Sequence, residues 1–388
     1  MLHKRRLLLF IITFLHLLYE NWIPTPSCDV VPSFNNPQFD PQKAVEKEEE
    51  EEDDDLKVMI IADLLLSGHD SGLGYLELDL HFKDFFFSRF FQKSFEFLKP
   101  DMLIVLGDVS ARGSELSRTN WASVLQQFHS LLGPFLDLPY HVVVGDRDIG
   151  ECSQLNEISV NQIARSFPGL DSSGCGAFGI GNVDFVSLNS VALLCGNNDL
   201  RFSVEKALER ERIELQTGSE HDTSGIKIRK YDFSWRENAM SSGSGPVLLL
   251  HFPLHQIENE SLKIGNLQDK AEPSKRSELG DGPYGLSQTL PPNATEYIFH
   301  ALRPRMVFSA HTQTFSDRTH PDGIREIVVP AMSWDAGKKP AFVYVTFRKN
   351  GTSAIVSHCK LAGRSHVLLF YTSLLFVLIL TVQTALRS

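Results

Sequence analysis

The chain has 388 residues, of which 42% are hydrophobic and 22% charged, which suits one large folded domain or two small ones. The formal net charge is −11, but an acidic run over 48–55 carries much of it, so the rest of the chain is close to neutral. This balance argues against a broad basic surface, and we expect no nucleic-acid partner. Five cysteines in a chain of this length exclude a small disulfide scaffold, and no C-x-x-C pair suggests structural zinc.

The N-terminal segment has the pattern of a secretory targeting sequence. Lys4, Arg5 and Arg6 precede an apolar run from Leu7 to Leu18. This pattern predicts a signal peptide over 1–27 that is either cleaved or kept as a signal anchor. In both cases the chain that follows enters the lumen of the secretory pathway. The next segment, 28–55, contains several prolines and the acidic run, and is expected to be a disordered linker.

The C-terminal segment 367–386 is uncharged and predicts a transmembrane helix. A buried core helix and a tail removed for a GPI anchor are the alternatives. Three N-x-S/T sequons, at Asn259, Asn293 and Asn350, agree with a lumenal region between the two ends.

The lumen also permits disulfide bonds, here among Cys152, Cys175, Cys195 and Cys359. The total is odd once Cys28 is counted, so one thiol is left unpaired or is lost with the signal.

The middle of the chain, over 56–361, alternates short apolar runs with helical segments. Runs of this kind are typical of strands buried on both faces. They cover 57–62, 102–107, 140–145, 184–188, 247–250 and 305–310. Helices are expected over 82–98, over 120–132 with Asn120 as a cap, and over 295–302. Strands without intervening helices are expected over 325–329, 341–347 and 353–358, and surface loops over 217–231 and 258–283. The pattern indicates an α/β class of layered domain.

Five of the strands end in a side chain that can bind a metal. In open α/β sheets the functional site lies beyond the carboxyl ends of the strands, so these groups are expected to meet there. Buried charges need a partner, and mixed carboxylate and imidazole ligands suit Mn, Zn or Fe. The alternative is a set of separate helix caps. The candidate metal ligands are Asp63, Asp108, Asp146, His251 and His311.

The order of these motifs resembles the calcineurin-like metallophosphoesterases over about 57–347. Asp63 to Leu65 stands in the place of D-x-H, Gly107-Asp108 fits G-D, Gly145 to Asp148 fits G-N-H-[DE], His251 fits the lone His, and His311 to Gln313 stands in the place of H-x-H. The resemblance implies a four-layer α-β-β-α sandwich, here with terminal hydrophobic helices, and a hydrolase site with one or two divalent ions, typically manganese.

Finer features resemble one branch, the membrane-tethered lumenal phosphoesterases that remodel GPI anchors. They include His251 to Leu254 and Val329 to Trp334. The branch implies hydrolysis of an ethanolamine phosphate ester on the GPI glycan during export of GPI-anchored proteins from the endoplasmic reticulum. It also implies a glycoprotein in the membrane of the endoplasmic reticulum or Golgi, with the main domain in the lumen.

The motifs differ from the family pattern at three positions. Leu65 replaces a ligand histidine, Gln313 replaces another, and Arg147 replaces the histidine that acts on the phosphate. One metal would therefore be held poorly. The set formed by Asp108, Asp146, His251 and His311 is intact and can hold one ion.

Two interpretations follow. In the first, the protein is an enzyme with one firmly held metal, and Arg147 and Asp146 serve in catalysis, with Arg147 binding the phosphate. In the second, Arg147 folds into the vacated site and neutralises Asp63 and Asp108, which leaves a pseudoenzyme that binds GPI glycans or cargo. His69, Asp70 and His255 are candidate substitute ligands but fit ordinary loop residues better, and Asn189 is expected to order a loop.

Overall fold

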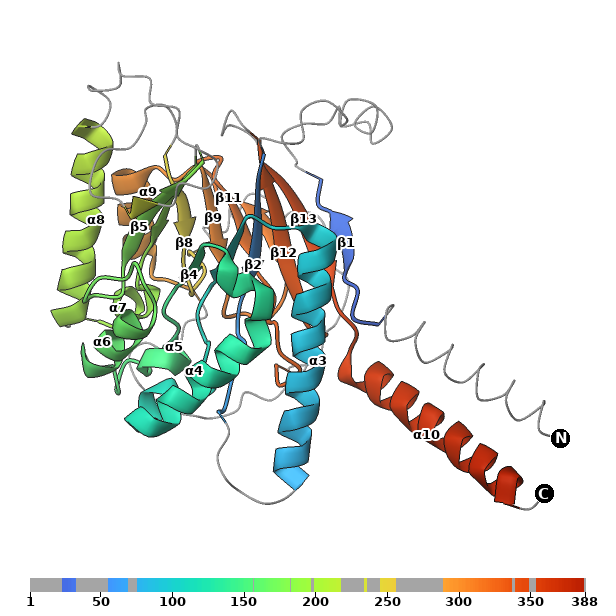
Figure 1. Ribbon diagram of the computed structural model, residues 1–388. Helices are drawn as coiled ribbons and strands as arrows, with labels where there is room; N and C mark the ends of the chain where they lie inside the picture. Colours follow the sequence, from blue (N-terminus) through green and yellow to red (C-terminus); the bar gives the residue numbers. More distant parts are fainter. Residues whose placement is uncertain are drawn as a thin grey trace, which may run out of the picture.

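The computed structural model describes residues 23–32, 55–68, 75–155, 157–181, 183–196, 199–217, 234–235, 245–255, 289–336, 339–348 and 354–386. Within these residues the chain forms two β-sheets that pack face to face, with helices on the outer faces (Figure 1). This arrangement confirms the predicted α/β class and the layered architecture.

The first sheet has six strands and mixes parallel and antiparallel pairs. Strands β2, β3 and β4 run parallel to one another, and the other neighbours are antiparallel. In spatial order the strands are β1 (Ser27–Val30), β13 (Ala354–Lys360), β12 (Ala341–Phe347), β2 (Leu56–Ile61), β3 (Met102–Val105) and β4 (Tyr140–Val142).

The second sheet has seven strands and is also mixed. Strands β11, β9, β8 and β6 are parallel neighbours, whereas β10, β5 and β7 join by antiparallel pairing. In spatial order the strands are β10 (Ser316–Thr319), β11 (Arg325–Val328), β9 (Met306–Ser309), β8 (Val247–Leu249), β6 (Val183–Ser187), β5 (Gly176–Ile180) and β7 (Ser234–Trp235).

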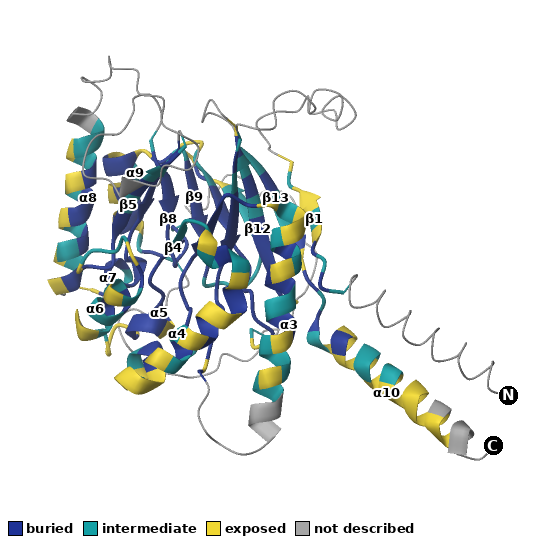
Figure 2. Ribbon diagram, viewed as in Figure 1, coloured by how far each residue is buried: buried dark blue, intermediate teal, exposed yellow. Residues whose placement is uncertain are grey.

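The central strands are buried on both faces (Figure 2). Alternate residues of each strand point to opposite faces, so Ile60 and Ile104 contribute to the core between the sheets. Met59 and Leu103 contribute to the core beneath the helices. This explains why the strands are continuous apolar runs in the sequence.

The outer layers consist of helices on both sides (Figure 1). They are α3 (Tyr75–Leu98), α4 (Arg118–Leu132), α5 (Asp146–Ile149), α6 (Glu157–Ser166), α7 (Ser190–Leu194), α8 (Asp199–Thr217) and α9 (Pro292–Leu302), with short 3₁₀ turns at Gly113–Glu115 and Gly133–Asp137. The prediction that Asn120 caps α4 is wrong. Ser117 is the cap, because its side chain accepts a hydrogen bond from the Asn120 backbone N–H.

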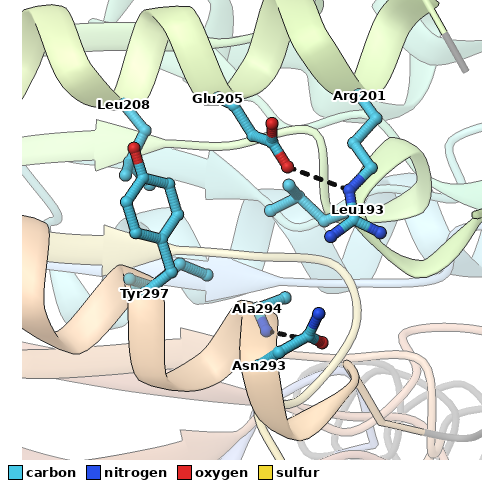
Figure 3. A pocket seen from close by; sticks show the side chains of 8 residues that line it. Leu193, Arg201, Glu205, Leu208, Asn293, Ala294 and Tyr297 are labelled. Carbon is cyan, nitrogen blue, oxygen red and sulfur yellow. Dashed lines mark hydrogen bonds and ion pairs between the residues drawn. The ribbon is translucent and has the colours of Figure 1, made fainter. Parts of the chain in front are cut away.

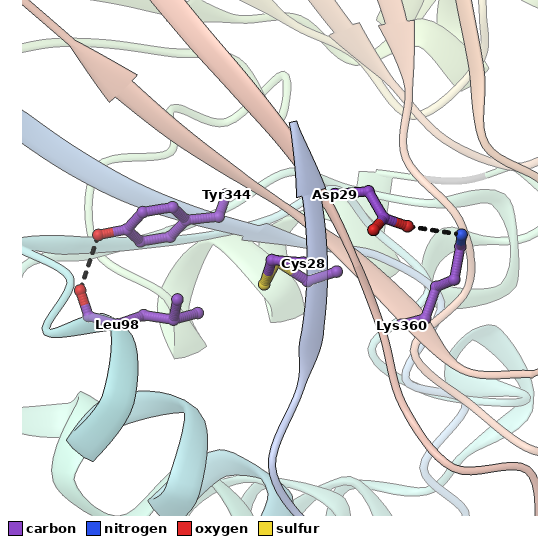
Figure 4. The surroundings of a disulfide bond; sticks show 6 residues. Cys28, Asp29, Leu98, Tyr344 and Lys360 are labelled. Atoms are coloured by element: carbon purple, nitrogen blue, oxygen red, sulfur yellow. Dashed lines mark hydrogen bonds and ion pairs between the residues drawn. A yellow bond between two sulfur atoms is a disulfide. The ribbon is translucent and has the colours of Figure 1, made fainter. Parts of the chain in front are cut away.

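Two disulfide bonds tie distant segments together. Cys28 of β1 is bonded to Cys359 of β13, and beside it Lys360 pairs with Asp29 at 2.9 Å (Figure 4). Cys152 is bonded to Cys195, which leaves Cys175 as the buried free thiol. Cys28 is therefore not the odd cysteine, and the first residues of the predicted linker 28–55 are part of a strand. The bonds are of the kind found in secreted or lumenal proteins.

The C-terminal helix α10 (Arg364–Leu386) covers the segment predicted to span a membrane, and much of its surface is exposed (Figure 2). Among the residues that the structure describes, no helix is both long and apolar enough to cross a bilayer. The predicted transmembrane helix over 367–386 is therefore not confirmed. The predicted signal segment up to residue 22, the acidic run before Asp55 and the predicted loop 258–283 lie outside the described residues.

Candidate metal centre

The five predicted ligands come together where strands of both sheets end. Asp63, Asp108 and Asp146 follow β2, β3 and β4, whereas His251 and His311 follow β8 and β9. Their ligand atoms fall into two groups, each within 4.8 Å: Asp146 with His251 and His311, and Asp63 with Asp108 and His251. Because His251 belongs to both groups, the five side chains form one continuous cluster.

The backbone at this edge adopts unusual conformations that direct the side chains. Asp63, Asp108 and His311 have φ values of 51°, 52° and 64°. Residues other than glycine occupy this left-handed region only at some cost, and such strain is concentrated at functional sites. Leu65 and Gln313 share it, with φ values of 55° and 59°, although Leu65 offers no ligand atom.

Glycine is required beside the cluster because the segments approach closely. Gly107 has a φ of 86°, and a Cβ atom there would lie 2.6 Å from Nδ1 of His251. A Cβ at Gly145 would lie 2.2 Å from Oδ1 of Asp108. The two glycines therefore allow the carboxylate and the imidazole to meet.

His251 is the central residue of the cluster. Its Nδ1 lies 2.7 Å from the carbonyl oxygen of Leu106, which can only accept, so Nδ1 carries a hydrogen. Its Nε2 faces Oδ1 of Asp146 at 2.8 Å and Oδ1 of Asp108 at 3.6 Å. Burial alone would lower the pKa of His251, but the Asp108 and Asp146 carboxylates outweigh it and raise the pKa to about 10. Nε2 therefore either holds a proton or binds a cation.

Asp146 holds the two histidines at the same oxygen. His311 approaches Oδ1 of Asp146 with its Nδ1 at 3.2 Å. Burial would raise the pKa of Asp146, but hydrogen bonds from His251 and His311 keep it well below its usual range. Asp146 is therefore the carboxylate of the cluster that stays ionised.

Asp63 is the residue of the cluster that points most directly to a cation. Its side chain is buried, and neither carboxylate oxygen has a hydrogen-bond partner among the described residues. Burial raises the pKa of Asp63 and raises that of Asp108 well above its usual value. Unpaired buried carboxylates are costly, and a cation at this point would satisfy them. Carboxylate oxygens and imidazole nitrogens together fit Mn, Zn or Fe.

Arg147 lies at the edge of the cluster and does not fill it. Its side chain is 43% exposed, and its Nε lies 3.5 Å from Oδ2 of Asp108. Its backbone N–H donates to Oδ1 of Asp108 at 3.0 Å. The guanidinium thus faces both the carboxylates and the solvent.

Several residues shape the centre without contributing ligand atoms, and the sequence analysis did not assign them. Asp148 accepts hydrogen bonds from the N–H groups of Val109, Ser110 and Gly145. Its place in the G-N-H-[DE] motif was the available signal. Burial raises the pKa of Asp148 to about 6. Ser190 Oγ accepts hydrogen bonds from the backbone N–H groups of His251 and Phe252.

The remaining candidates lie elsewhere. Asn189 caps α7 by accepting from Ala192 N–H and donates to the carbonyl of Ser173, so it orders a loop, as predicted. His255 is not in either group of ligand atoms, and His69 and Asp70 lie outside the described residues.

The family model described as calcineurin-like phosphoesterase matches residues 79–315, which include Asp108, Asp146, His251 and His311 but not Asp63. Metallophosphoesterase 1 of Rattus norvegicus is 28% identical over 335 residues, which cover 84% of this chain and 77% of that protein. Metallophosphoesterase 1 of Mus musculus is 28% identical over 316 residues, with 81% and 74% covered.

Among solved structures, a dimetal phosphatase from Danio rerio aligns with a TM-score of 0.41 and 13% identity, covering 78% of this chain and 98% of that one. The family model spans more than half of the sequence. The chain belongs to the calcineurin-like phosphoesterase family.

Proposed function

We propose that this protein is a metal-dependent phosphoesterase that binds at least one divalent ion through Asp108, Asp146, His251 and His311, with Asp63 as an additional ligand. The observation that carries the proposal is the Asp63 carboxylate, which is buried beside Asp108 and His251 and has no hydrogen-bond partner in the part of the chain that the structure describes. In the pseudoenzyme considered above, Arg147 would neutralise both Asp63 and Asp108. The Arg147 side chain is 43% exposed and approaches Asp108 at 3.5 Å, but among the described residues the Asp63 carboxylate has no hydrogen-bond partner.

The residues suit hydrolysis of a phosphate ester. A bound divalent ion supplies a Lewis acid for the phosphoryl oxygen. Arg147 is positioned to bind another phosphoryl oxygen, because its guanidinium offers several donors and keeps its charge at every physiological pH. The same property prevents Arg147 from donating a proton to the leaving group. That proton must therefore come from another group of the site or from solvent.

The substrate class that we propose is a phosphodiester such as ethanolamine phosphate on a GPI glycan. The support for this substrate comes from motifs that resemble those of the GPI-remodelling phosphoesterases. Similarity to proteins named Metallophosphoesterase 1 supports the broader class of phosphoesterase. The disulfide bonds are consistent with a protein that functions in the secretory pathway, and we propose that it is located in the endoplasmic reticulum or Golgi. We propose GPI-anchored proteins as its partners and manganese as its metal ion.

A second candidate function is binding without catalysis. Leu65 and Gln313 favour it, because they occupy positions where the family has ligand histidines. With these side chains a second ion would lack two of its imidazole ligands. Such a protein would recognise the GPI glycan and leave it intact.

One experiment separates the two functions. The purified protein is loaded with Mn or Zn, its metal content is measured, and hydrolysis of bis(p-nitrophenyl) phosphate is followed. We expect about one ion per chain and turnover, with both lost in His251→Ala and both kept in the control His255→Ala. Bound GPI glycan without metal or turnover would support the binding protein instead. Release of ethanolamine phosphate from a GPI glycan then tests the substrate.

A further inference from the structure

Glu326 in β11 is a fully buried carboxylate with four polar partners. Its Oε1 accepts from the Ser309 hydroxyl at 2.6 Å and from the backbone N–H of Leu254 at 3.0 Å. Its Oε2 faces Nε2 of His320 at 2.8 Å and Nε of Arg318 at 3.2 Å. The Arg318 guanidinium places a positive charge beside this carboxylate and His320 adds a polar contact, which leaves Oε1 for the other two groups.

The two groups on Oε1 belong to the segments that carry the histidines of the metal centre. Leu254 lies in the turn after His251, and Ser309 is the last residue of β9, just before His311. The backbone adds one further link, because Ala310 N–H donates to the carbonyl of His251 at 2.9 Å. A single oxygen of Glu326 thus bridges the two segments.

We infer that Glu326 is a positioning residue that fixes the separation of His251 and His311, an inference that rests on the proposed metal site. An oxygen acceptor is needed because an apolar side chain of similar size would leave Leu254 N–H and the Ser309 hydroxyl unpaired. Groups that orient metal ligands typically change metal affinity by about 10–100-fold when removed. Glu326 contributes to the site through the two histidines and touches neither ion nor substrate.

The test measures the dissociation constant of Mn and the melting temperature together. We expect Glu326→Ala and Ser309→Ala to weaken Mn binding, the former by about 10–100-fold. Glu326→Gln keeps an oxygen acceptor and should restore most of the affinity. The control Asp317→Asn breaks the ion pair with Arg325 in the same hairpin, so it should lower the melting temperature and leave Mn binding unchanged.

Unchanged Mn affinity in Ser309→Ala and Glu326→Ala, with only lower melting temperatures, would overturn the inference. If the wild-type protein binds no metal, the proposed function fails separately. Crystal structures of metal-free wild type and Ser309→Ala then decide the positioning role, because it requires His251 and His311 to move apart in the variant.

A different region carries a second, independent inference. A cavity of about 180 Å³ lies between α8 and α9, away from the metal centre (Figure 3). Tyr297 of α9 points toward α8, where Arg201 and Glu205 form an ion pair at 2.9 Å. The remaining lining residues are Leu193, Leu208, Asn293, Ala294 and Ile298.

Asn293 on the rim of this cavity begins the sequon Asn293-Ala294-Thr295. It lies exposed in the first turn of α9, and its Oδ1 accepts from Ala294 N–H at 3.0 Å. Thr295 is buried, and its hydroxyl accepts from His255 N–H at 2.9 Å. A glycosyl transferase can therefore recognise the sequon only before the chain folds, whereas the Asn293 side chain stays at the surface after folding.

We propose that Asn293 carries an N-linked glycan whose first sugar sits in the α8–α9 cavity, against the Tyr297 ring and the Arg201–Glu205 pair. The donor is a lipid pyrophosphate-linked oligosaccharide in the compartment that forms the disulfides. Nδ2 of Asn293 forms a bond to C1 of the first sugar, the C1–oxygen bond to the lipid pyrophosphate breaks, and Nδ2 gives up one proton to the transferase. The half-exposed tyrosine ring offers an apolar face to the sugar, and the ion pair offers hydrogen-bond partners.

Glycopeptide mass spectrometry of the full chain from secretory cells tests the modification. We expect a glycan on the Asn293 peptide, retained in Thr295→Ser and lost in Asn293→Asp. An unmodified Asn293 peptide in the wild type would overturn the proposal.

Enzymatic deglycosylation tests whether the first sugar occupies the cavity. The reaction converts Asn293 to aspartate, so the variant Asn293→Asp is the matched control. Deglycosylation should lower the melting temperature of the wild type more than that of Tyr297→Ala. An equal change in both proteins would show that the sugar does not use the cavity.

Discussion

The imidazole of His251 donates its Nδ1 hydrogen to the carbonyl oxygen of Leu106 at 2.7 Å, and this bond turns Nε2 toward Asp146 and Asp108. The arrangement is typical of metal-binding histidines, in which the second ring nitrogen is held by a backbone carbonyl. It also determines how the site exchanges protons for a metal ion.

Metal binding is expected to release at least one proton at pH 7. In the metal-free protein the pKa of His251 is about 10, so Nε2 is protonated at pH 7 and must lose that proton before it can bind an ion. The apparent dissociation constant should therefore rise about tenfold for each pH unit by which the pH falls. Isothermal titration calorimetry in buffers of different ionisation enthalpy measures the protons released. Metal-binding heats that do not depend on the buffer would contradict the conclusion that Nε2 is protonated at pH 7.

Replacing Asp63 should stabilise the metal-free protein while weakening the metal site. Burial raises the pKa of Asp63, so its ionisation at neutral pH costs folding free energy. Asp63→Asn is expected to raise the free energy of unfolding by about 1–3 kcal/mol without metal. The gain should shrink at acidic pH, because the protonated carboxyl no longer carries this cost. Urea denaturation with and without Mn checks the prediction, and with Mn the wild type should be the more stable protein.

Much of the metal centre could be predicted from the sequence because parallel strands place their carboxyl ends at one edge. Each apolar run located a strand, and for five of the six runs the polar residue after it located a candidate ligand. The backbone geometry that turns Asp63 and Asp108 inward has no comparable signal. Glu326 could not be identified either, because a single acidic residue in a short strand is usually exposed.

Two of the elements that were missed are polar in sequence. Strand β10 reads Ser-Asp-Arg-Thr and forms because it pairs with β11, a tertiary contact. Helix α8 is rich in charged residues. The partner of Cys28 was also missed, because five cysteines permit many pairings and only the fold brings β1 beside β13.

Arg147 should contribute to substrate binding through its guanidinium. Removing a charged hydrogen-bond donor to phosphate costs about 1.5–3 kcal/mol, so Arg147→Ala is expected to lower kcat/KM by about 10–100-fold. Arg147→Lys should recover only part of this loss, because lysine lacks the paired donors. Arg112→Ala is the control, since Arg112 is exposed on a neighbouring turn. Steady-state kinetics with a phosphodiester gives kcat/KM for the three variants. An unchanged kcat/KM in Arg147→Ala would show that Arg147 takes no part in the mechanism.

The two disulfide bonds should differ in what they contribute to stability. Cys28 and Cys359 are 331 residues apart, whereas Cys152 and Cys195 are 43 apart. In the chain-entropy account, the longer loop restricts the unfolded state more, by about 2 kcal/mol at 25 °C. We therefore expect the double serine variant of the first pair to lose about 2 kcal/mol more unfolding free energy than that of the second. Urea denaturation under identical conditions compares them, and the reverse order would show that native contacts at β1 determine the result.

His141 should make the folded protein sensitive to acid. It is fully buried in β4, its Nε2 lies 2.8 Å from Ser187 Oγ, and burial lowers its pKa to about 3. Below about pH 6.5 the unfolded chain binds a proton at this residue and the folded chain does not. His141 therefore contributes its full stability above that pH, and the contribution decreases by about 1.4 kcal/mol per pH unit as the pH falls toward 3.

His141→Gln keeps a partner for Ser187 and removes the titration, so its unfolding free energy should fall less steeply between pH 6 and 4. The control is His129→Gln, an exposed position on α4 that should follow the wild type. Urea denaturation at a series of pH values gives the slopes. Equal slopes for the wild type and His141→Gln would mean that the buried imidazole accepts a proton without unfolding, because the core around β4 opens to water.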